Sequence, residues 1–170
     1  SPKGIEVCRT ALEIAKEHET KVSISFSDPN IINAFRKDIQ SLLEIQCDLI
    51  FCNQEEALAY AETDSVNNAF ELLKETSPNF LITQGSSGCV GFDGKNQIDI
   101  PGHKVEAIDS NGAGDMFAGA VLYCLSQGQS LEDGAKFGCY AASKVVSHVG
   151  PRLSKEEYKK QIIESLKWIG

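Results

Sequence analysis

A glycine-rich stretch near residue 112 combines exposed backbone N–H groups with a carboxylic acid. It reads Asp109-Ser110-Asn111-Gly112-Ala113-Gly114-Asp115 and is followed by an apolar, helix-forming run from Met116. The two glycines leave backbone N–H groups exposed at a helix start, where the helix dipole adds partial positive charge, so this turn is suited to bind an anion. An acid beside bound phosphate is useful as the base that takes a proton from an attacking hydroxyl. The stretch therefore predicts a phosphotransferase with Asp115 as its catalytic base.

Two commoner glycine motifs do not fit the chain. The dinucleotide fingerprint would require glycine where Phe117 stands, which disfavours a dinucleotide-dependent oxidoreductase. The P-loop comes closest at Gly94-Lys95, but Cys89 replaces its first glycine and Asn96 its hydroxyl residue. A plainer interpretation stays open, in which the stretch is only a glycine-softened helix start and Asp115 an acid that favours the dipole.

Composition indicates one globular domain over residues 1–170. The chain is 42% hydrophobic and 24% charged, and its net charge of −8 argues against partners such as nucleic acid or an anionic membrane. No apolar run approaches membrane-spanning length. The six cysteines form no C-x-x-C pair and lie mostly among apolar neighbours, so we expect buried free thiols in a cytoplasmic protein. The three histidines have no partner in the sequence pattern and suggest surface or interior positions.

Hydrophobic periodicity predicts an α/β protein. Near-continuous apolar strands alternate with amphipathic helices, which indicates a mainly parallel sheet covered on both faces, a three-layer α/β/α arrangement. The expected strands are 22–26, 49–52 and 80–83, and the expected helices are 5–15, 31–43, 54–61 and 66–74. A β-hairpin around Asp93-Gly94 follows at 89–100.

The last third of the chain is expected to be helical. A strand-like run, 105–108, leads into the glycine-rich stretch. Two helices, 112–127 and 130–148, should pack together, since small residues line one face of the second. A capping box at Ser154-x-x-Glu157 begins a last helix that should turn Tyr158, Ile162 and Leu166 inward.

Three loops follow predicted strands, and the loops at the carboxyl ends of parallel strands share one ligand-binding edge. They are Asn53-Gln54-Glu55-Glu56, Thr83-Gln84-Gly85-Ser86-Ser87-Gly88 and the stretch 109–115. Together they offer an amide and a carboxylate for a hydrated metal, a glycine loop for phosphate, and an anion-binding helix end. Taken singly, Asn53 could merely cap a helix, Glu56 could be a solvated acid, and the second loop could be a plain turn.

These motifs resemble those of the ribokinase-like (PfkB) carbohydrate and nucleoside kinases, over nearly the whole chain and in the family's order. The matching motifs are Asn53-x-x-Glu56, Thr83-x-Gly85-x-x-Gly88 and the stretch 109–115. The resemblance implies a ribokinase-like, Rossmann-like fold and ATP-dependent phosphorylation of a CH2OH group on a small-molecule nucleoside or sugar. It also implies ATP and Mg²⁺ as cofactors, and a homodimer of the full-length protein is an expectation of the same kind.

The resemblance assigns roles to individual residues. Asp115 matches the catalytic base, and Gly112, Ala113 and Gly114 match the anion hole. Asn53 and Glu56 match residues that organise Mg²⁺ through water. The implied ATP-binding residues are Thr83, Gly85, Gly88, Asn111, Gly138 and Ala142, with the stretch 102–105 flanking adenine. A monovalent cation, K⁺, is implied at Asp109 together with carbonyl groups near Asn111 and in 146–151.

One departure limits the resemblance to part of the family's domain. Family members are considerably longer, and their N-terminal half supplies a lid and a Gly-Gly-x-x-x-Asn acceptor motif that this chain lacks. We therefore expect a C-terminal part that carries the nucleotide half of the site and is inactive alone. Asn111 and the stretch 25–29 resemble adenosine-kinase-type members more than sugar kinases, which implies a nucleoside acceptor. A non-catalytic nucleotide-binding or interaction module on the same fold stays open as an alternative.

Overall fold

The computed structural model describes residues 2–163 and divides the chain into two compact units. Unit 1 comprises Ser1–Ile82 and Gly91–Gln97, and unit 2 comprises Thr83–Val90 and Ile98–Gly170. Five strands form a sheet in the order β1-β2-β3-β4-β5, and strands β4 and β5 contribute residues to both units. The chain is therefore an α/β protein, as its periodicity predicts.

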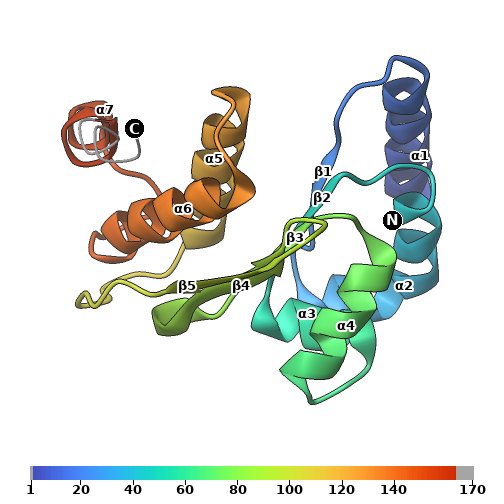
Figure 1. The fold of residues 1–170 in the computed structure, drawn as a ribbon, viewed down its shortest axis with the longest axis horizontal. Coiled ribbons are helices and arrows are strands. Elements are labelled where there is room, and N and C mark those ends of the chain that lie inside the picture. Colours follow the sequence, from blue (N-terminus) through green and yellow to red (C-terminus); the bar gives the residue numbers. More distant parts are fainter. Residues whose placement is uncertain (1, 164–170) are drawn as a thin grey trace. The chain divides into compact units, whose positions relative to one another are not determined.

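Unit 1 alternates strands and helices (Figure 1). Strand β1 pairs in parallel with β2, and Ser23 lies opposite Leu49. The backbone N–H of Ile50 donates to the carbonyl of Asn79 at 3.0 Å, directly before β3. The strands are β1 (Ser23–Ser25), β2 (Leu49–Asn53) and β3 (Phe80–Thr83), and the helices are α1 (Pro2–Glu17), α2 (Pro29–Leu43), α3 (Gln54–Ala61) and α4 (Val66–Thr76). All seven elements match predicted ones, with boundaries shifted by a few residues.

Short polar side chains decide where the helices of unit 1 begin. Asp28 accepts hydrogen bonds from the first-turn N–H groups of α2, and Ser65 caps α4 in the same way. Pro29 starts α2, where its missing N–H costs no hydrogen bond. These caps follow apolar strands or turns, which is why the sequence pattern located the helices well.

Aromatic rings fill the core of unit 1. The rings of Phe70 and Phe80 pack edge to face with their centroids 4.9 Å apart, and Phe92 lies 6.3 Å from Phe80. Lys74 Nζ lies over the Phe92 ring, 5.4 Å from its centroid. Strand β3 is fully buried at Phe80, Leu81 and Ile82. A strand buried on both faces agrees with its continuous apolar run.

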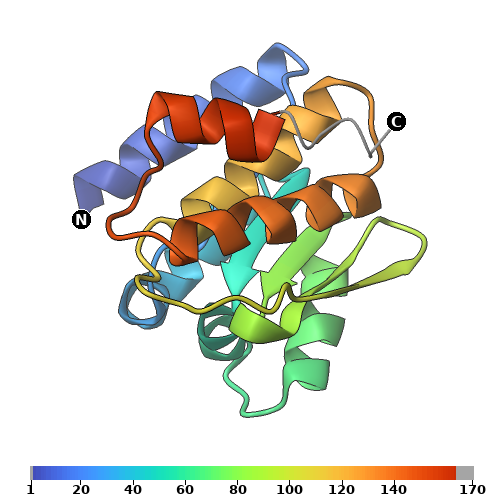
Figure 2. The same cartoon turned by 90° about the vertical axis from the view of Figure 1, so that its left-hand side faces the viewer.

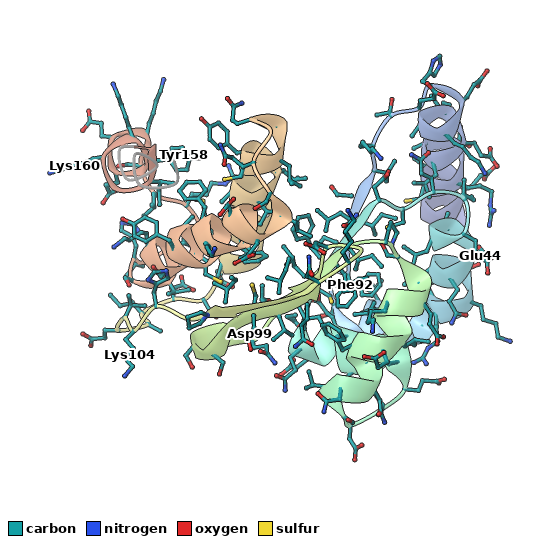
Figure 3. All side chains as sticks on the ribbon, viewed as in Figure 1. Glu44, Phe92, Asp99, Lys104, Tyr158 and Lys160 are labelled. Atoms are coloured by element: carbon teal, nitrogen blue, oxygen red, sulfur yellow. The ribbon has the colours of Figure 1, made fainter. Side chains whose placement is uncertain are left out.

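Strands β4 and β5 form a hairpin whose turn belongs to unit 1, and the rest of unit 2 is mainly helical. Strands β4 (Gly88–Phe92) and β5 (Gln97–Pro101) are joined by a turn in which the N–H of Asp93 donates to the carbonyl of Asn96 at 3.1 Å. The predicted hairpin at 89–100 is thereby confirmed. Along β5, Ile98 and Ile100 are buried while Asp99 is exposed (Figure 3). The remaining elements are η1 (Gly85–Ser87), α5 (Ala113–Ser126), α6 (Leu131–Val146), α7 (Lys155–Tyr158) and η2 (Lys159–Ile163).

Helices α5 and α6 pack side by side, which confirms the predicted pairing of two helices (Figure 2). Glycine permits their close approach at Gly138, where a Cβ would lie 2.7 Å from the Phe117 ring. The core of this pair also includes Ile162 from η2, and Tyr158 packs against the same cluster. The inward orientation predicted for these two residues is confirmed, whereas Leu166 lies outside the described residues.

The prediction of a strand at 105–108 is wrong. These residues form an extended loop in which Val105 is 41% and Ile108 59% exposed. No strand pairing is present, because the N–H of Ile108 donates instead to the carbonyl of Val146 at the end of α6, at 2.7 Å. The last helix also departs from expectation, since α7 ends at Tyr158 and continues as the π-helix η2.

Candidate active site

A cavity of about 430 Å³ lies within unit 2. Its walls come from the loop after β3, the loop after β5, the start of α5 and one face of α6, in residues 83–88, 102–107, 110–117 and 139–146. This volume falls in the usual range for small-molecule sites, about 300–1,000 Å³. Two of the three loops that the sequence marks for ligand binding, 83–88 and 109–115, therefore contribute to one cavity, whereas no residue of 53–56 lines it.

The loop after β3 owes its shape to glycine. Gly88 has φ +99°, and a Cβ there would collide with the carbonyl oxygen of Ile100. The N–H of Gln84 donates to the carbonyl of Gly88 at 2.8 Å, which closes the loop. Gly85 has φ +58°, yet a Cβ there would meet nothing within 4 Å. Thr83, Gly85 and Gly88 all line the cavity, so the predicted phosphate loop borders an open space.

Helix α5 begins at the cavity without a side-chain cap. Gly112 is its N-cap at φ +77°, and a Cβ there would collide with the backbone of Pro151. Within the described part of the chain, no side chain caps this end, so its first-turn N–H groups are left for water or a ligand. Ala113 and Gly114 line the cavity, and a Cβ on Gly114 would meet nothing within 4 Å. The uncapped, positively polarised end of the helix therefore borders the cavity.

Asp115 lies one residue beyond Gly114 in the first turn of α5 and is exposed. A carboxylate at this position is favoured by the helix dipole. Its position suits a proton acceptor beside an anion bound at the helix start.

Asp109 ties the turn before α5 to the segment after α6. Its carboxylate accepts hydrogen bonds from the N–H of Asn111 and of Gly150, both at 3.0 Å. These two bonds hold the pKa of the Asp109 carboxyl below its usual value. Asn111 itself is exposed and is not among the cavity-lining residues. An ionised carboxylate thus organises the loop that carries Gly112.

Helix α6 presents one face to the cavity, at Cys139, Ala142, Ser143 and Val146. Their spacing of i, i+3, i+4 and i+7 is that of a single helical face. Ala142 lies where the sequence places a nucleotide contact. Gly138 is not among the lining residues and instead packs against Phe117, whose ring does line the cavity.

Sequence reasoning named neither Cys139 nor Ser143, although both line the cavity. Cys139 could have been found from the sequence, because it lies three residues before Ala142 on one helical face. His103 lies in the stretch 102–105 that was expected to flank adenine, and it does line the cavity. The His103 and Tyr140 rings meet edge to face with centroids 5.6 Å apart, and Lys144 Nζ lies 4.8 Å from the Tyr140 centroid on the same helix.

Asn53 and Glu56 form a capping box at the start of α3, in unit 1. The Asn53 N–H donates to Glu56 Oε2 at 2.9 Å, Asn53 Nδ2 donates to Oε1 at 2.8 Å, and the Glu56 N–H donates to Asn53 Oδ1 at 2.8 Å. Glu56 is buried, not solvated, and burial raises the pKa of its carboxyl, with smaller contributions from the negative charges of Asp28 and Glu55. Asn53 is therefore a helix cap, whatever further role it has.

Two broader features of residues 2–163 bear on the site. None of the helices there has the length and hydrophobicity needed to cross a membrane. That same part of the chain contains no group of three or more His, Cys, Asp or Glu side chains placed to hold a metal ion. Within the predicted motifs, the carboxylates of Glu56 and Asp109 accept hydrogen bonds from backbone N–H groups.

The fold and the cavity define an α/β protein of the ribokinase-like class. Residues 4–157 match the family model described as pfkB family carbohydrate kinase, and the chain belongs to this family. The resemblance seen in the sequence motifs is thereby confirmed.

Similar proteins include nucleoside and sugar kinases. The chain is 33% identical to adenosine kinase 1 of Arabidopsis thaliana over 88% of its length and 30% identical to fructokinase-1 of Oryza sativa subsp. japonica over 94%, covering 47% and 55% of those proteins. It matches the crystal structure of adenosine kinase from Sinorhizobium meliloti with a TM-score of 0.87 and 28% identity, over 96% of this chain and 49% of that one. The chain thus spans about half the length of these relatives.

Proposed function

We propose that the protein carrying this chain transfers the γ-phosphoryl group of ATP to a hydroxyl of a nucleoside or sugar. This chain then supplies the ATP-binding and catalytic part of a single kinase domain with a three-layer α/β/α fold. The observation that carries the proposal is the uncapped start of α5, which borders the cavity at Gly114 and places Asp115 in the same turn. An anion site and a base joined in one helical turn are what phosphoryl transfer to an alcohol requires.

Each wall of the cavity has a part in this proposal. The loop at Thr83, Gly85 and Gly88 holds the ATP phosphates, and the first-turn N–H groups of α5 stabilise the charge that develops on the transferred group. The apolar atoms of Phe117, Ala142 and other α6 residues form a surface for adenine, with 102–105 on its other side. Asp115 accepts the proton of the attacking hydroxyl.

Cations fit the acidic groups next to these motifs. When bound, Mg²⁺ would neutralise charge on the phosphates. Asn53 and Glu56, to which the family resemblance assigns its water ligands, carry amide and carboxylate oxygens that suit this ion. Asp109 is ionised and retains lone pairs beyond its two backbone hydrogen bonds, which suits a K⁺ ion near Asn111 and the segment after α6. The loss of activity when potassium is replaced by a large organic cation would support this site, and unchanged activity would exclude it.

Replacing the base tests the reaction. In the full-length protein, Asp115→Asn should lower turnover about 10²–10⁴-fold, the usual contribution of a general base. ATP affinity should change little, because the exposed carboxylate is not part of the cavity wall. Steady-state kinetics and calorimetric titration with ATP measure the two quantities separately.

The matched control is Asp99→Asn, which removes an exposed acid from β5, away from the start of α5. It should leave turnover unchanged. Near-normal turnover of Asp115→Asn would refute the assigned base. ATP binding without transfer to adenosine, ribose or fructose by the unaltered full-length protein would favour a non-catalytic nucleotide-binding module instead, and transfer to sugars alone would overturn the preference for a nucleoside.

A further inference from the structure

A buried serine lies in the part of the cavity wall that helix α6 supplies. Ser143 is only 6% exposed, and it lines the cavity together with Cys139, Ala142 and Val146 on the same helical face. The Phe117 ring from α5 lines the cavity as well. Ser143 therefore places a hydroxyl group next to apolar and thiol side chains in this wall.

The proton of this hydroxyl is already used within the helix. Ser143 Oγ donates to the backbone carbonyl of Tyr140 at 2.6 Å. A carbonyl oxygen has no proton and can only accept, so the direction of this hydrogen bond is fixed. As long as the bond is kept, the Ser143 hydroxyl meets a ligand as an acceptor, through the oxygen lone pairs that remain.

The turn of α6 that contains this hydrogen bond is held by further contacts. The Tyr140 side chain contacts both the His103 ring and the ammonium group of Lys144. Ser147 Oγ donates to the Ser143 carbonyl at 2.9 Å. Because Ser143 is buried, another side-chain rotamer would disturb its packing and break the bond to Tyr140. The acceptor is therefore preorganised before a ligand binds.

Polarity separates the two ends that a nucleotide would occupy in the cavity. The uncapped start of α5 and the glycine loop after β3 suit the phosphates, whereas the α6 face is mainly apolar and suits the base. An acceptor in an apolar wall favours a base that carries an N–H group at the contact. A base without one leaves the Ser143 oxygen both unpaired and out of water, which weakens binding.

We propose that Ser143 selects the base of the nucleotide by accepting a hydrogen bond from the 6-amino group of adenine. A 6-oxo purine would bring two acceptor oxygens together, so the cavity should reject it. Ser143 is then a specificity-determining residue for ATP. This inference rests on the proposed function for the presence of a nucleotide in the cavity, and it does not depend on the transfer step.

Matched nucleotides test the contact in the unaltered full-length protein. Calorimetric titrations compare ATP with purine riboside triphosphate, which lacks the 6-amino group, and with inosine triphosphate, which has a 6-oxo group. We expect ATP to bind about five- to tenfold more tightly than purine riboside triphosphate, the usual effect of one neutral hydrogen bond. Inosine triphosphate should bind no more tightly than purine riboside triphosphate. Equal Kd values for ATP and purine riboside triphosphate overturn the inference without any variant.

Ser143→Ala then assigns the discrimination to this residue. The variant should bind ATP about five- to tenfold more weakly but purine riboside triphosphate with at least the unaltered affinity, so the ratio of the two Kd values falls to about one. A merely structural role of Ser143 would weaken the binding of both nucleotides alike. An unchanged ratio in Ser143→Ala therefore overturns the inference.

Ser126→Ala is the matched control. Ser126 Oγ donates to the Tyr123 carbonyl at 2.7 Å, which is the same bond to the third preceding residue, but Ser126 is exposed on α5 and is not among the cavity-lining residues. This variant should keep the ratio of the unaltered protein. Loss of the ratio in Ser126→Ala would contradict a local contact at Ser143.

The outcomes separate this inference from the proposed function. Discrimination that depends on Ser143, without phosphoryl transfer to adenosine, ribose or fructose, supports the base contact and refutes the reaction. Transfer from ATP without discrimination between the nucleotides supports the reaction and refutes the base contact. Binding of none of the three nucleotides refutes both.

Discussion

Gly112 and Gly114 are two positions apart, and the structure uses them for different reasons. Gly112 has φ +77° and touches the backbone of Pro151, so no other residue fits there without strain. Gly114 is within α5, and a Cβ there would enter open space at the cavity. Folding therefore gives no reason for glycine at 114. Close approach of a ligand to the backbone, as in the proposed function, would give one.

Gly114→Ala separates stability from ligand binding. The thermal midpoint should stay the same or rise, since alanine is favoured over glycine inside helices by up to about 1 kcal/mol. A methyl group between the phosphates and the helix start should nevertheless lower kcat/KM about tenfold or more, or about 1.4 kcal/mol. Calorimetry and kinetics on the full-length protein give the two values.

Gly119→Ala provides the control for this prediction. Gly119 also lies in α5, is exposed, and has nothing within 4 Å of its Cβ position. Gly119→Ala should likewise keep or raise the thermal midpoint, and it should leave kcat/KM unchanged. Equal kinetics for the two alanine variants would mean that no ligand approaches Gly114 closely.

At the scale of elements, contact between α5 and α6 determines the shape of the cavity. A Cβ on Gly138 would lie 2.7 Å from the Phe117 ring, and the same ring lines the cavity. Gly138 thus acts on the site through its packing against Phe117. This packing accounts for a glycine at a position to which the family resemblance assigns ATP binding. The helix α6 can supply Ala142 and Val146 to the wall only because glycine lets it approach α5 at this point.

Gly138→Ala should destabilise the chain by about 1–3 kcal/mol, the usual cost of overpacking a core. The displaced Phe117 ring should also weaken ATP binding. Urea unfolding and calorimetric titration measure these effects. Gly134→Ala is the comparison, because its Cβ would lie 3.3 Å from Val121 and needs only a small adjustment, so its cost should be lower. The same cost for both variants would contradict the account of the Phe117 contact.

At the scale of the whole molecule, the chain spans about half of the kinases it resembles, for example 47% of Arabidopsis adenosine kinase 1. Apolar side chains on α1 are correspondingly exposed, including Val7 at 68% and Ile14 at 53%, seven residues apart on one helical face. Catalysis by positioning needs acceptor, phosphate and base held together with water excluded. In the proposed function, the described cavity holds the nucleotide, and the acceptor needs further contacts.

The 170-residue chain by itself should therefore phosphorylate adenosine, ribose or fructose at no useful rate and bind ATP weakly. Its exposed apolar face should also promote self-association at micromolar concentration. Coupled ADP-release assays and sedimentation velocity test these expectations, with the full-length protein as reference. Rapid turnover by a monodisperse monomer would show that the acceptor site is already present in this chain.

Local sequence determined most of the secondary structure. Apolar runs located β2 and β3, short polar residues such as Asp28 and Ser65 located the helix starts, and the Asp93-Gly94 turn located the hairpin. These features depend on residues within a few positions of each other, which is why periodicity and capping rules predict them. The three motifs at 53–56, 83–88 and 109–115, taken together, also indicated the family to which the chain belongs.

Tertiary structure decided what lies beside these elements. An apolar run at 105–108 remains a loop because the carbonyl of Val146, nearly forty positions away, accepts its hydrogen bond. Gly138 contacts Phe117 only after α6 packs on α5. Contacts of this kind depend on chain segments distant in sequence, so local patterns carry no signal for them. Sequence alone thus determined the elements and the family, while packing decided which side chains form the cavity.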